Sequence, residues 1–134
     1  MEHAQWTVAN SGVTEGLKSV IWSGRQYVVV GYNGVILTSG DGINWIPRSS
    51  GVTPNVYGET PTLFSVAWTG EMFIVVGDDG LVLSSPDGIS WESSFAGEYE
   101  GACPNLYSVA WTGTQLVAVG KIGTVMTSLR VLTS

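Results

Sequence analysis

The sequence contains little of what catalytic and metal-binding sites are usually built from. Its 134 residues include a single cysteine, Cys103, and a single histidine, His3. One cysteine cannot form a disulfide within the chain. Without a cluster of cysteine and histidine we predict no zinc site, no other metal and no cofactor. Because candidate catalytic groups are so few, we also expect that the protein is not an enzyme.

Long apolar runs and helical patterns are absent as well. The longest apolar runs, such as YVVVG at 27–31 and FIVVG at 73–77, are too short to cross a bilayer, so we expect no membrane partner. No basic segment followed by an apolar core is visible as a signal peptide, which leaves the compartment unknown and the cytoplasm as the default. No window carries the apolar spacing of an amphipathic helix.

Positive charge is scarce. Five lysine and arginine residues stand against eleven carboxylates, which gives a formal net charge of −6, and no basic residue lies between Arg48 and Lys121. Such a surface repels phosphate backbones, so we expect no nucleic-acid partner. What the sequence does have is 18 glycines and six tryptophans, with much valine, threonine and serine. This mixture is typical of strands and tight turns, and it predicts an all-β fold.

Three segments of the chain repeat one another. They read LKSVIWSG at 17–24, LFSVAWTG at 63–70 and LYSVAWTG at 106–113, and they align without gaps. Each is followed by a second and a third apolar run with glycine between them. Units of 40 to 50 residues with several strands have the period of β-propeller blades. We therefore predict a single propeller segment over 1–134, built of four-stranded antiparallel meanders.

The repeat sets the boundaries of these blades. They run over about 17–62, 63–105 and 106–134, with an N-terminal strand at 5–14 in addition. Within each unit, glycine-containing turns reverse the chain between the second and third strands.

A second motif joins the third strand to the fourth. It reads TSGDGINW at 38–45 and SSPDGISW at 84–91. Asp-Gly suits a tight hairpin, because glycine accepts a positive φ and the aspartate can accept hydrogen bonds from nearby backbone N–H groups. The serine is placed to join that network, and the tryptophan to pack on a neighbouring blade. We assign a structural role to Ser39, Asp41, Trp45, Ser85, Asp87 and Trp91.

The motif resembles the Asp-box of BNR-type propellers, which include sialidase-like and photosystem-assembly-factor-like proteins. The usual family box has one more residue between Asp and Gly, so the two boxes here are variants. The resemblance covers nearly the whole chain as repeats, and it implies a propeller architecture. The arginine cluster and tyrosine nucleophile of the sialidases have no recognisable counterpart around Arg25, Arg48 and Arg130, so no sialidase activity is implied.

The ends of the sequence suggest how the ring could close. WTVANSGVT at 6–14 aligns with WIPRSSGVT at 45–53, so the chain starts on a fourth strand and is circularly permuted by one strand. Since propellers need roughly four to eight blades, we expect the strand at Trp6 to complete a second copy, giving six blades in a homodimer. The alternatives are a trimer, an excised or engineered fragment, and a fourth strand formed by LRVLTS at 129–134.

The least repetitive stretches are the loops that join one blade to the next. Recognition residues are usually carried on variable loops of a rigid scaffold. We predict a binding rim from the tyrosine and glutamate residues of these loops, which are Tyr57, Glu59, Glu98, Tyr99 and Glu100. Such a rim would suit a glycan, a basic peptide or a cation. The predicted function is a non-enzymatic, self-assembling binding or scaffold module; the alternatives are a glycan hydrolase with a site shared between chains, and a fragment without a ligand.

Overall fold

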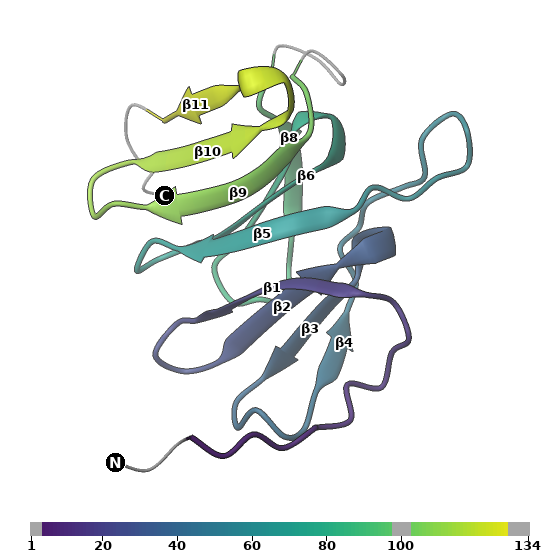
Figure 1. The fold of residues 1–134 in the computed structure, drawn as a ribbon, viewed down its shortest axis with the longest axis vertical. Coiled ribbons are helices and arrows are strands. Elements are labelled where there is room, and N and C mark those ends of the chain that lie inside the picture. Colours follow the sequence, from purple (N-terminus) through teal and green to yellow (C-terminus); the bar gives the residue numbers. More distant parts are fainter. Residues whose placement is uncertain (1–3, 98–102, 129–134) are drawn as a thin grey trace.

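The computed structural model describes residues 4–97 and 103–128 and shows an all-β protein of antiparallel sheets (Figure 1). Sheet 1 is the meander β1 Leu17–Trp22, β2 Tyr27–Gly31, β3 Ile36–Ser39 and β4 Ile46–Arg48. Sheet 2 is the meander β5 Leu63–Trp68, β6 Phe73–Gly77, β7 Leu81–Ser85 and β8 Glu92–Phe95. Sheet 3 contains β9 Leu106–Trp111, β10 Leu116–Gly120 and β11 Val125–Thr127. The all-β fold of antiparallel meanders expected from the repeats is confirmed. The alternative fourth strand LRVLTS at 129–134 lies outside the described residues.

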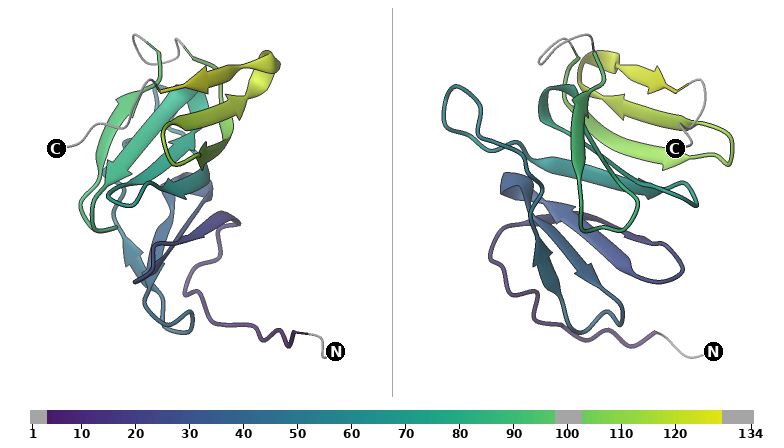
Figure 2. Two further views of the ribbon diagram at one scale, coloured as in Figure 1. Left: turned by 90° about the vertical axis from the view of Figure 1, so that its left-hand side faces the viewer. Right: turned by 180° about the vertical axis from the view of Figure 1, so that it is seen from behind.

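The three sheets follow one another along the long axis of the molecule in the order of the sequence (Figures 1 and 2). The N-terminal segment runs along the end that sheet 1 forms, and residues 5–14 are not a strand in this single chain. Trp6 and Val8 are 91 % and 102 % exposed. The strand predicted at 5–14 is therefore absent from the isolated chain, because within the described residues no sheet edge pairs with it.

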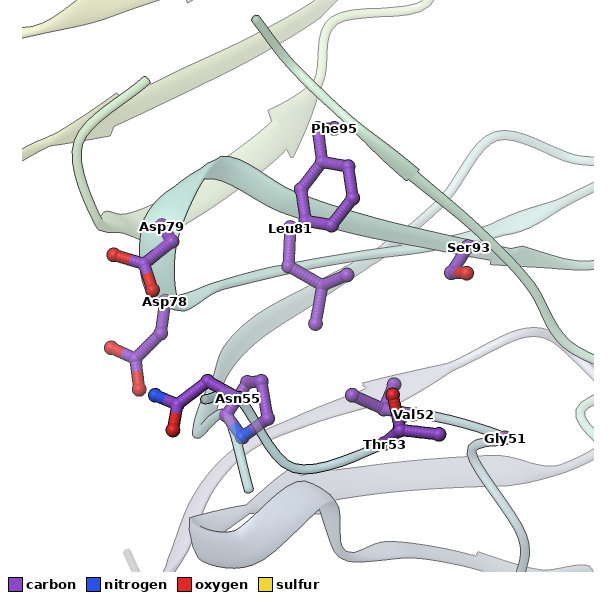
Figure 3. A pocket seen from close by; sticks show the side chains of 10 residues that line it. Gly51, Val52, Thr53, Asn55, Asp78, Asp79, Leu81, Ser93 and Phe95 are labelled. Carbon is purple, nitrogen blue, oxygen red and sulfur yellow. The ribbon is translucent and has the colours of Figure 1, made fainter. Parts of the chain in front are cut away.

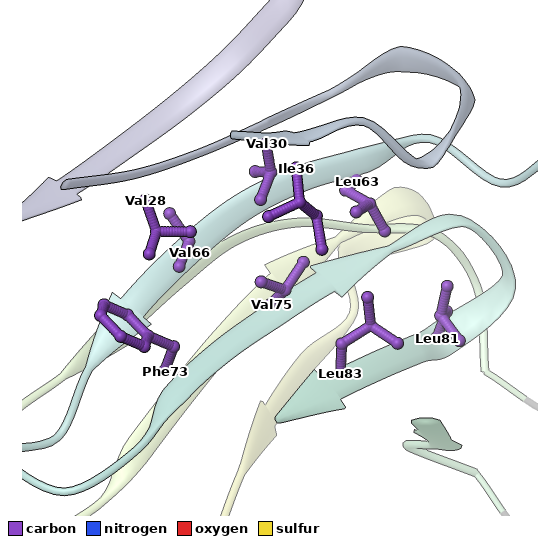
Figure 4. Close-up of a cluster of buried hydrophobic side chains, with 9 residues drawn as sticks. All are labelled: Val28, Val30, Ile36, Leu63, Val66, Phe73, Val75, Leu81 and Leu83. Atoms are coloured by element: carbon purple, nitrogen blue, oxygen red, sulfur yellow. The ribbon is translucent and has the colours of Figure 1, made fainter. Parts of the chain in front are cut away.

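The hydrophobic core lies between the sheets. One cluster joins Val28, Val30 and Ile36 of sheet 1 to the facing side of sheet 2, where Leu63 and Leu83 are fully buried (Figure 4). A second cluster lies between sheets 2 and 3. A strand has side chains on both faces, so each sheet of a propeller depends on its neighbours to keep both faces dry.

A repeated hydrogen bond also crosses between the sheets. The Ser19 hydroxyl accepts from the backbone N–H of Val66 at 3.3 Å, and the Ser65 hydroxyl accepts from that of Val109 at 3.1 Å. Both serines occupy the same place in the repeat. The first strands of the three sheets, β1, β5 and β9, are thus joined by hydrogen bonds as well as by packing.

The turns between the second and third strands share one backbone shape. Each is a short 3₁₀ turn, and its central residue has a φ between 58° and 60°. These residues are Asn33, Asp79 and Ile122. Left-handed backbone suits asparagine and aspartate and is strained for a β-branched residue such as isoleucine.

The serine and aspartate of each box build the turn between the third and fourth strands. The Asp41 carboxylate accepts from the backbone N–H groups of Ile43 and Asn44 at 2.8 and 2.9 Å, and from the Ser39 hydroxyl at 3.0 Å. The second box repeats these bonds around Asp87. One oxygen of each carboxylate, Oδ1, thus accepts all of these bonds from its own turn.

These bonds favour the ionised carboxylates. The N–H groups of Asn44 and then Ile43 lower the pKa of Asp41, and those of Ser90 and then Ile89 lower the pKa of Asp87. Both groups therefore bind protons less readily in the folded chain than in the unfolded one.

The tryptophan of each box lies one residue before the fourth strand. The Trp91 indole N–H donates to the Gly88 carbonyl at 3.0 Å, and its ring packs against the core between sheets 1 and 2. Trp45 lies 6.0 Å from the Tyr27 ring within sheet 1. The second box thus supports packing between neighbouring sheets.

Truncating a side chain at the centre of the first cluster should weaken the whole fold. For Leu83→Ala we expect a loss of about 2–5 kcal/mol in the free energy of unfolding, because the chain loses burial and gains a cavity. Urea denaturation followed by tryptophan fluorescence measures this. Val56→Ala is the control, since Val56 is 93 % exposed and its truncation should change stability by less than about 0.5 kcal/mol. Equal effects would contradict the assigned core.

The boxes should make the fold acid-sensitive. Because the folded pKa values of Asp41 and Asp87 lie below the ordinary 3.8, their contribution is complete above that value and is lost as pH falls through and below it. In the double variant Asp41→Asn, Asp87→Asn the amide oxygens can still accept the hydrogen bonds of the turns, but these two positions no longer bind protons as the pH falls. We expect urea titrations from neutral to acid pH to give a smaller loss of stability than in the wild type. An unchanged acid dependence would contradict this role.

Candidate functional site

The candidate site is a hollow at the end of the sheets that carries the blade-to-blade loops and the 3₁₀ turns, opposite the Asp-boxes. The turns η1 Tyr32–Gly34 and η2 Asp78–Gly80 reach this end, and so does the long loop at 49–62 (Figure 1). The hollow has a volume of about 390 Å³. It is lined by Asn33, Asn55, Glu59, Thr60, Pro61, Thr62, Asp78, Asp79 and Asn105.

A smaller pocket of about 90 Å³ adjoins the hollow and shares Asn55, Pro61, Asp78 and Asp79 with it. Figure 3 shows the two carboxylates and the Asn55 amide at one side of this pocket, with Leu81 and Phe95 along another. Leu81 is buried and Phe95 is 36 % exposed. The combined site therefore offers carboxylates at one end and an aromatic ring at the other.

The loop at 49–62 is shaped by one asparagine. The Asn55 side-chain oxygen accepts from the N–H groups of Tyr57 and Glu59 at 2.9 and 3.0 Å. The Asn55 N–H donates to the Glu59 carbonyl at 2.8 Å, which closes the loop. The loop projects from the body of the molecule with Tyr57 on it, 84 % exposed (Figure 1). Glu59 lies at the base, where the closed loop meets the hollow.

The two aspartates of η2 are fixed differently. The backbone N–H of Asp78 donates to the Thr62 carbonyl at 3.1 Å, and its carboxylate accepts from the Thr62 N–H at 2.9 Å, so Asp78 clamps the start of β5. The Asp79 N–H donates to the side-chain oxygen of Asn105 at 2.8 Å, which ties η2 to sheet 3. The Asp79 residue is exposed. Asp79 therefore has a fixed backbone and a carboxylate available to a ligand.

The charged residues that line the hollow and the adjoining pocket, namely Glu59, Asp78 and Asp79, all carry negative charge. Among residues 4–97 and 103–128, no group of three or more His, Cys, Asp and Glu side chains is arranged to hold a metal ion. Over the same ranges, no helix is long and apolar enough to cross a membrane. Cys103 is buried, and desolvation raises the pKa of its thiol.

The structure places the predicted binding residues in different surroundings. Glu59 lines the hollow, whereas Tyr57 projects from the loop and does not line it. Glu98, Tyr99 and Glu100 lie outside the described residues. The sequence prediction of a binding rim did not include the three asparagines Asn33, Asn55 and Asn105. The sequence feature that could have identified them is their position in turns or just before a strand, where asparagine side chains often form hydrogen bonds with the loop backbone.

Comparison with known proteins identifies the fold. No family model matches the chain, and no curated protein matches it. A solved structure described as YCF48 bound to D1 peptide is 18 % identical, with a TM-score of 0.75 over 97 % of this chain. The chain spans 43 % of that protein's length.

A second similar structure is that of the computationally designed Ika4 protein. It is 12 % identical, with a TM-score of 0.46, and the match covers 94 % of this chain and 98 % of that protein. Together with the three successive antiparallel sheets, the likeness to YCF48 establishes that the chain is a segment of a β-propeller.

Proposed function

We propose that the chain is a non-enzymatic binding module, a self-assembling propeller segment whose loop-end hollow takes a basic peptide. The observation that carries this proposal is the meeting of Glu59, Asp78 and Asp79 at one hollow without a basic residue among its lining. Carboxylates are the natural partners of lysine and arginine side chains. Asparagine side chains can both donate to and accept from a peptide backbone.

The adjoining pocket supports a peptide over a smaller ligand. Phe95 and Leu81 offer an apolar surface next to the carboxylates, so an apolar residue of the peptide could contact them while a basic residue reaches Asp79. YCF48, which shares the fold, has been solved with a peptide bound. That example supports a peptide ligand for this architecture without specifying its sequence here.

The hollow also differs from a repeated sugar site. Its central turn residue is Asp79 in sheet 2, but Asn33 and Ile122 occupy the same place in the other sheets. A lectin with one site per blade would need similar residues in each blade. We therefore favour one acidic site per chain that binds a basic peptide. Binding of a glycan in its place is one of the results that would contradict this proposal.

A matched set of variants tests the site with short fluorescent peptides of basic, neutral and acidic composition, followed by fluorescence anisotropy. We expect the basic peptide to bind most tightly and salt to weaken its binding. Asp79→Asn and Glu59→Gln should each weaken binding about two- to five-fold, which corresponds to the ~0.4–1 kcal/mol of an exposed ion pair. Asp79→Asn should fold normally, because Asn33 has the same φ of 58° at the equivalent position.

Glu71→Gln is the control for this experiment, because it removes the same charge at the opposite end of sheet 2, in the turn between β5 and β6. Its affinity for the basic peptide should equal that of the wild type. Tyr57→Ala tests whether the loop tip, and not the hollow, binds the peptide. If only this variant loses affinity for the basic peptide, the binding site lies on the loop tip. Equal binding of all peptides, or binding of glycans instead, would contradict the proposal.

The non-enzymatic part of the proposal has its own test. A panel of chromogenic glycosides should show no turnover with the wild-type protein. Reproducible hydrolysis that Glu98→Gln or Glu100→Gln abolishes would contradict the proposal and favour a glycan hydrolase.

A further inference from the structure

We propose that two copies of the chain dock head to tail, sheet 3 of each against sheet 1 of the other, through the contacts that join sheets 1 and 2 within the chain. The inference rests on the self-assembly in the proposed function and specifies its surfaces. A second copy of the chain covers the outer faces of sheets 1 and 3, because the repeat makes each of these faces equivalent to a face that is buried between two sheets of one chain.

The first observation is the exposure of equivalent residues. Leu63 and Val66 of sheet 2 are 0 % and 4 % exposed where they pack on sheet 1. Their equivalents in sheet 1, Leu17 and Val20, are 42 % and 58 % exposed. The face of sheet 1 that points away from sheet 2 therefore presents two of the apolar side chains that such an interface uses, while Val29 and Leu37, at the places of Val75 and Leu83, are already buried within the chain.

Sheet 3 presents the complementary face. Val30 and Ile36 of sheet 1, which pack on sheet 2, are 0 % and 1 % exposed. Their equivalents in sheet 3 are Val119 and Val125, which are 43 % and 65 % exposed. The two outer faces of the array thus carry the two halves of the interface between sheets 1 and 2.

The repeated hydrogen bond between a serine hydroxyl and a valine N–H leaves one half of the pair at each end of the chain. Ser19 accepts from Val66 and Ser65 accepts from Val109, so each serine bonds to the next sheet. By the same step, Ser108 of sheet 3 would accept from the backbone N–H of Val20 in the second copy. Both Ser108 and Val20 are exposed in the single chain.

A glutamine contact shows the same complementarity. The Gln26 side chain of sheet 1 donates to the carbonyl of Asp87, in the box of sheet 2, at 2.8 Å. Sheet 2 has Met72 at the glutamine position, a side chain with no N–H to donate, but sheet 3 has Gln115 there. The equivalent carbonyl for Gln115 is that of Asp41, in the box of sheet 1, which a second copy would supply.

The turn at residues 11–13 has the same shape as the turn that follows β4. The Val13 N–H donates to the Ser11 hydroxyl at 3.3 Å, just as the Val52 N–H donates to the Ser50 hydroxyl at 3.1 Å after β4. Gly12 and Gly51 between them have φ values of 80° and 73°. Residues 7–9, equivalent to β4, would therefore add to the β11 edge of the second copy as its outer strand.

A ring of two copies follows from these contacts. The two-fold axis makes both junctions identical, and the six sheets fall within the four to eight blades that propellers use. Each junction would bury apolar side chains on two faces and add backbone hydrogen bonds along β11.

Light scattering coupled to size-exclusion chromatography tests the docking at micromolar concentration. We expect the wild type to have twice the 14.2 kDa mass of one chain. Val20→Asp and Val125→Asp should each halve that mass, because each places a charge in both junctions. Val56→Asp, which alters an apolar residue exposed on the loop, should retain the double mass. Circular dichroism verifies that each variant keeps its strands.

A cysteine pair gives a second readout that does not depend on weakening the interface. In a Cys103→Ser background, Val20→Cys with Ser108→Cys should oxidise to a chain linked to its copy, visible on a non-reducing gel. The reference pair Ser19→Cys with Val66→Cys should oxidise within one chain, since the Ser19 hydroxyl lies 3.3 Å from the Val66 nitrogen.

The docking is overturned by a wild type of single-chain mass, by charge variants that keep the double mass, or by a Val20–Ser108 pair that forms no link between copies. These outcomes are distinct from failure of the peptide site, because the hollow is formed within one chain. A wild-type monomer that binds the basic peptide overturns the docking and the self-assembly but leaves the peptide site, and a dimer that binds no peptide overturns only the peptide site.

Discussion

The packing of one sheet against the next is the contact on which the rest of this structure depends. Each sheet is too small to bury both of its faces, and the two core clusters form only between neighbours. The loop-end hollow exists because this packing fixes the sheets relative to one another. Asp78 completes it within sheet 2 by its bonds to Thr62, and Asp79 completes it between sheets 2 and 3 by its bond to Asn105.

The repeat keeps the residues that build the turns apart from the residues that vary between blades. At one end each Asp-box uses one oxygen of its carboxylate, in Asp41 and in Asp87, to accept hydrogen bonds from its own turn. At the other end the turns keep a common backbone while their side chains vary, from Asn33 to Asp79 to Ile122. A site at that end can therefore differ from blade to blade without disturbing the fold.

The sequence predicted the strands well because their pattern is local and repeated. The tryptophans Trp45 and Trp91 mark the fourth strands to within a residue. The site was predicted less well, since its loops take their shape from particular hydrogen bonds. Asn55 folds its loop so that Glu59 reaches the hollow and Tyr57 does not, and neither tyrosine spacing nor composition reports that bond.

Amide hydrogen exchange at Val20 tests the central claim about the packing of sheets most directly. The N–H groups of Val66 and Val109 are bonded to serines of the preceding sheet, and Val20 occupies the same position at the free face. If a second copy supplies Ser108, the Val20 amide should exchange as slowly as those of Val66 and Val109 at micromolar concentration. Rapid exchange at Val20, with the other two amides protected, would contradict the account.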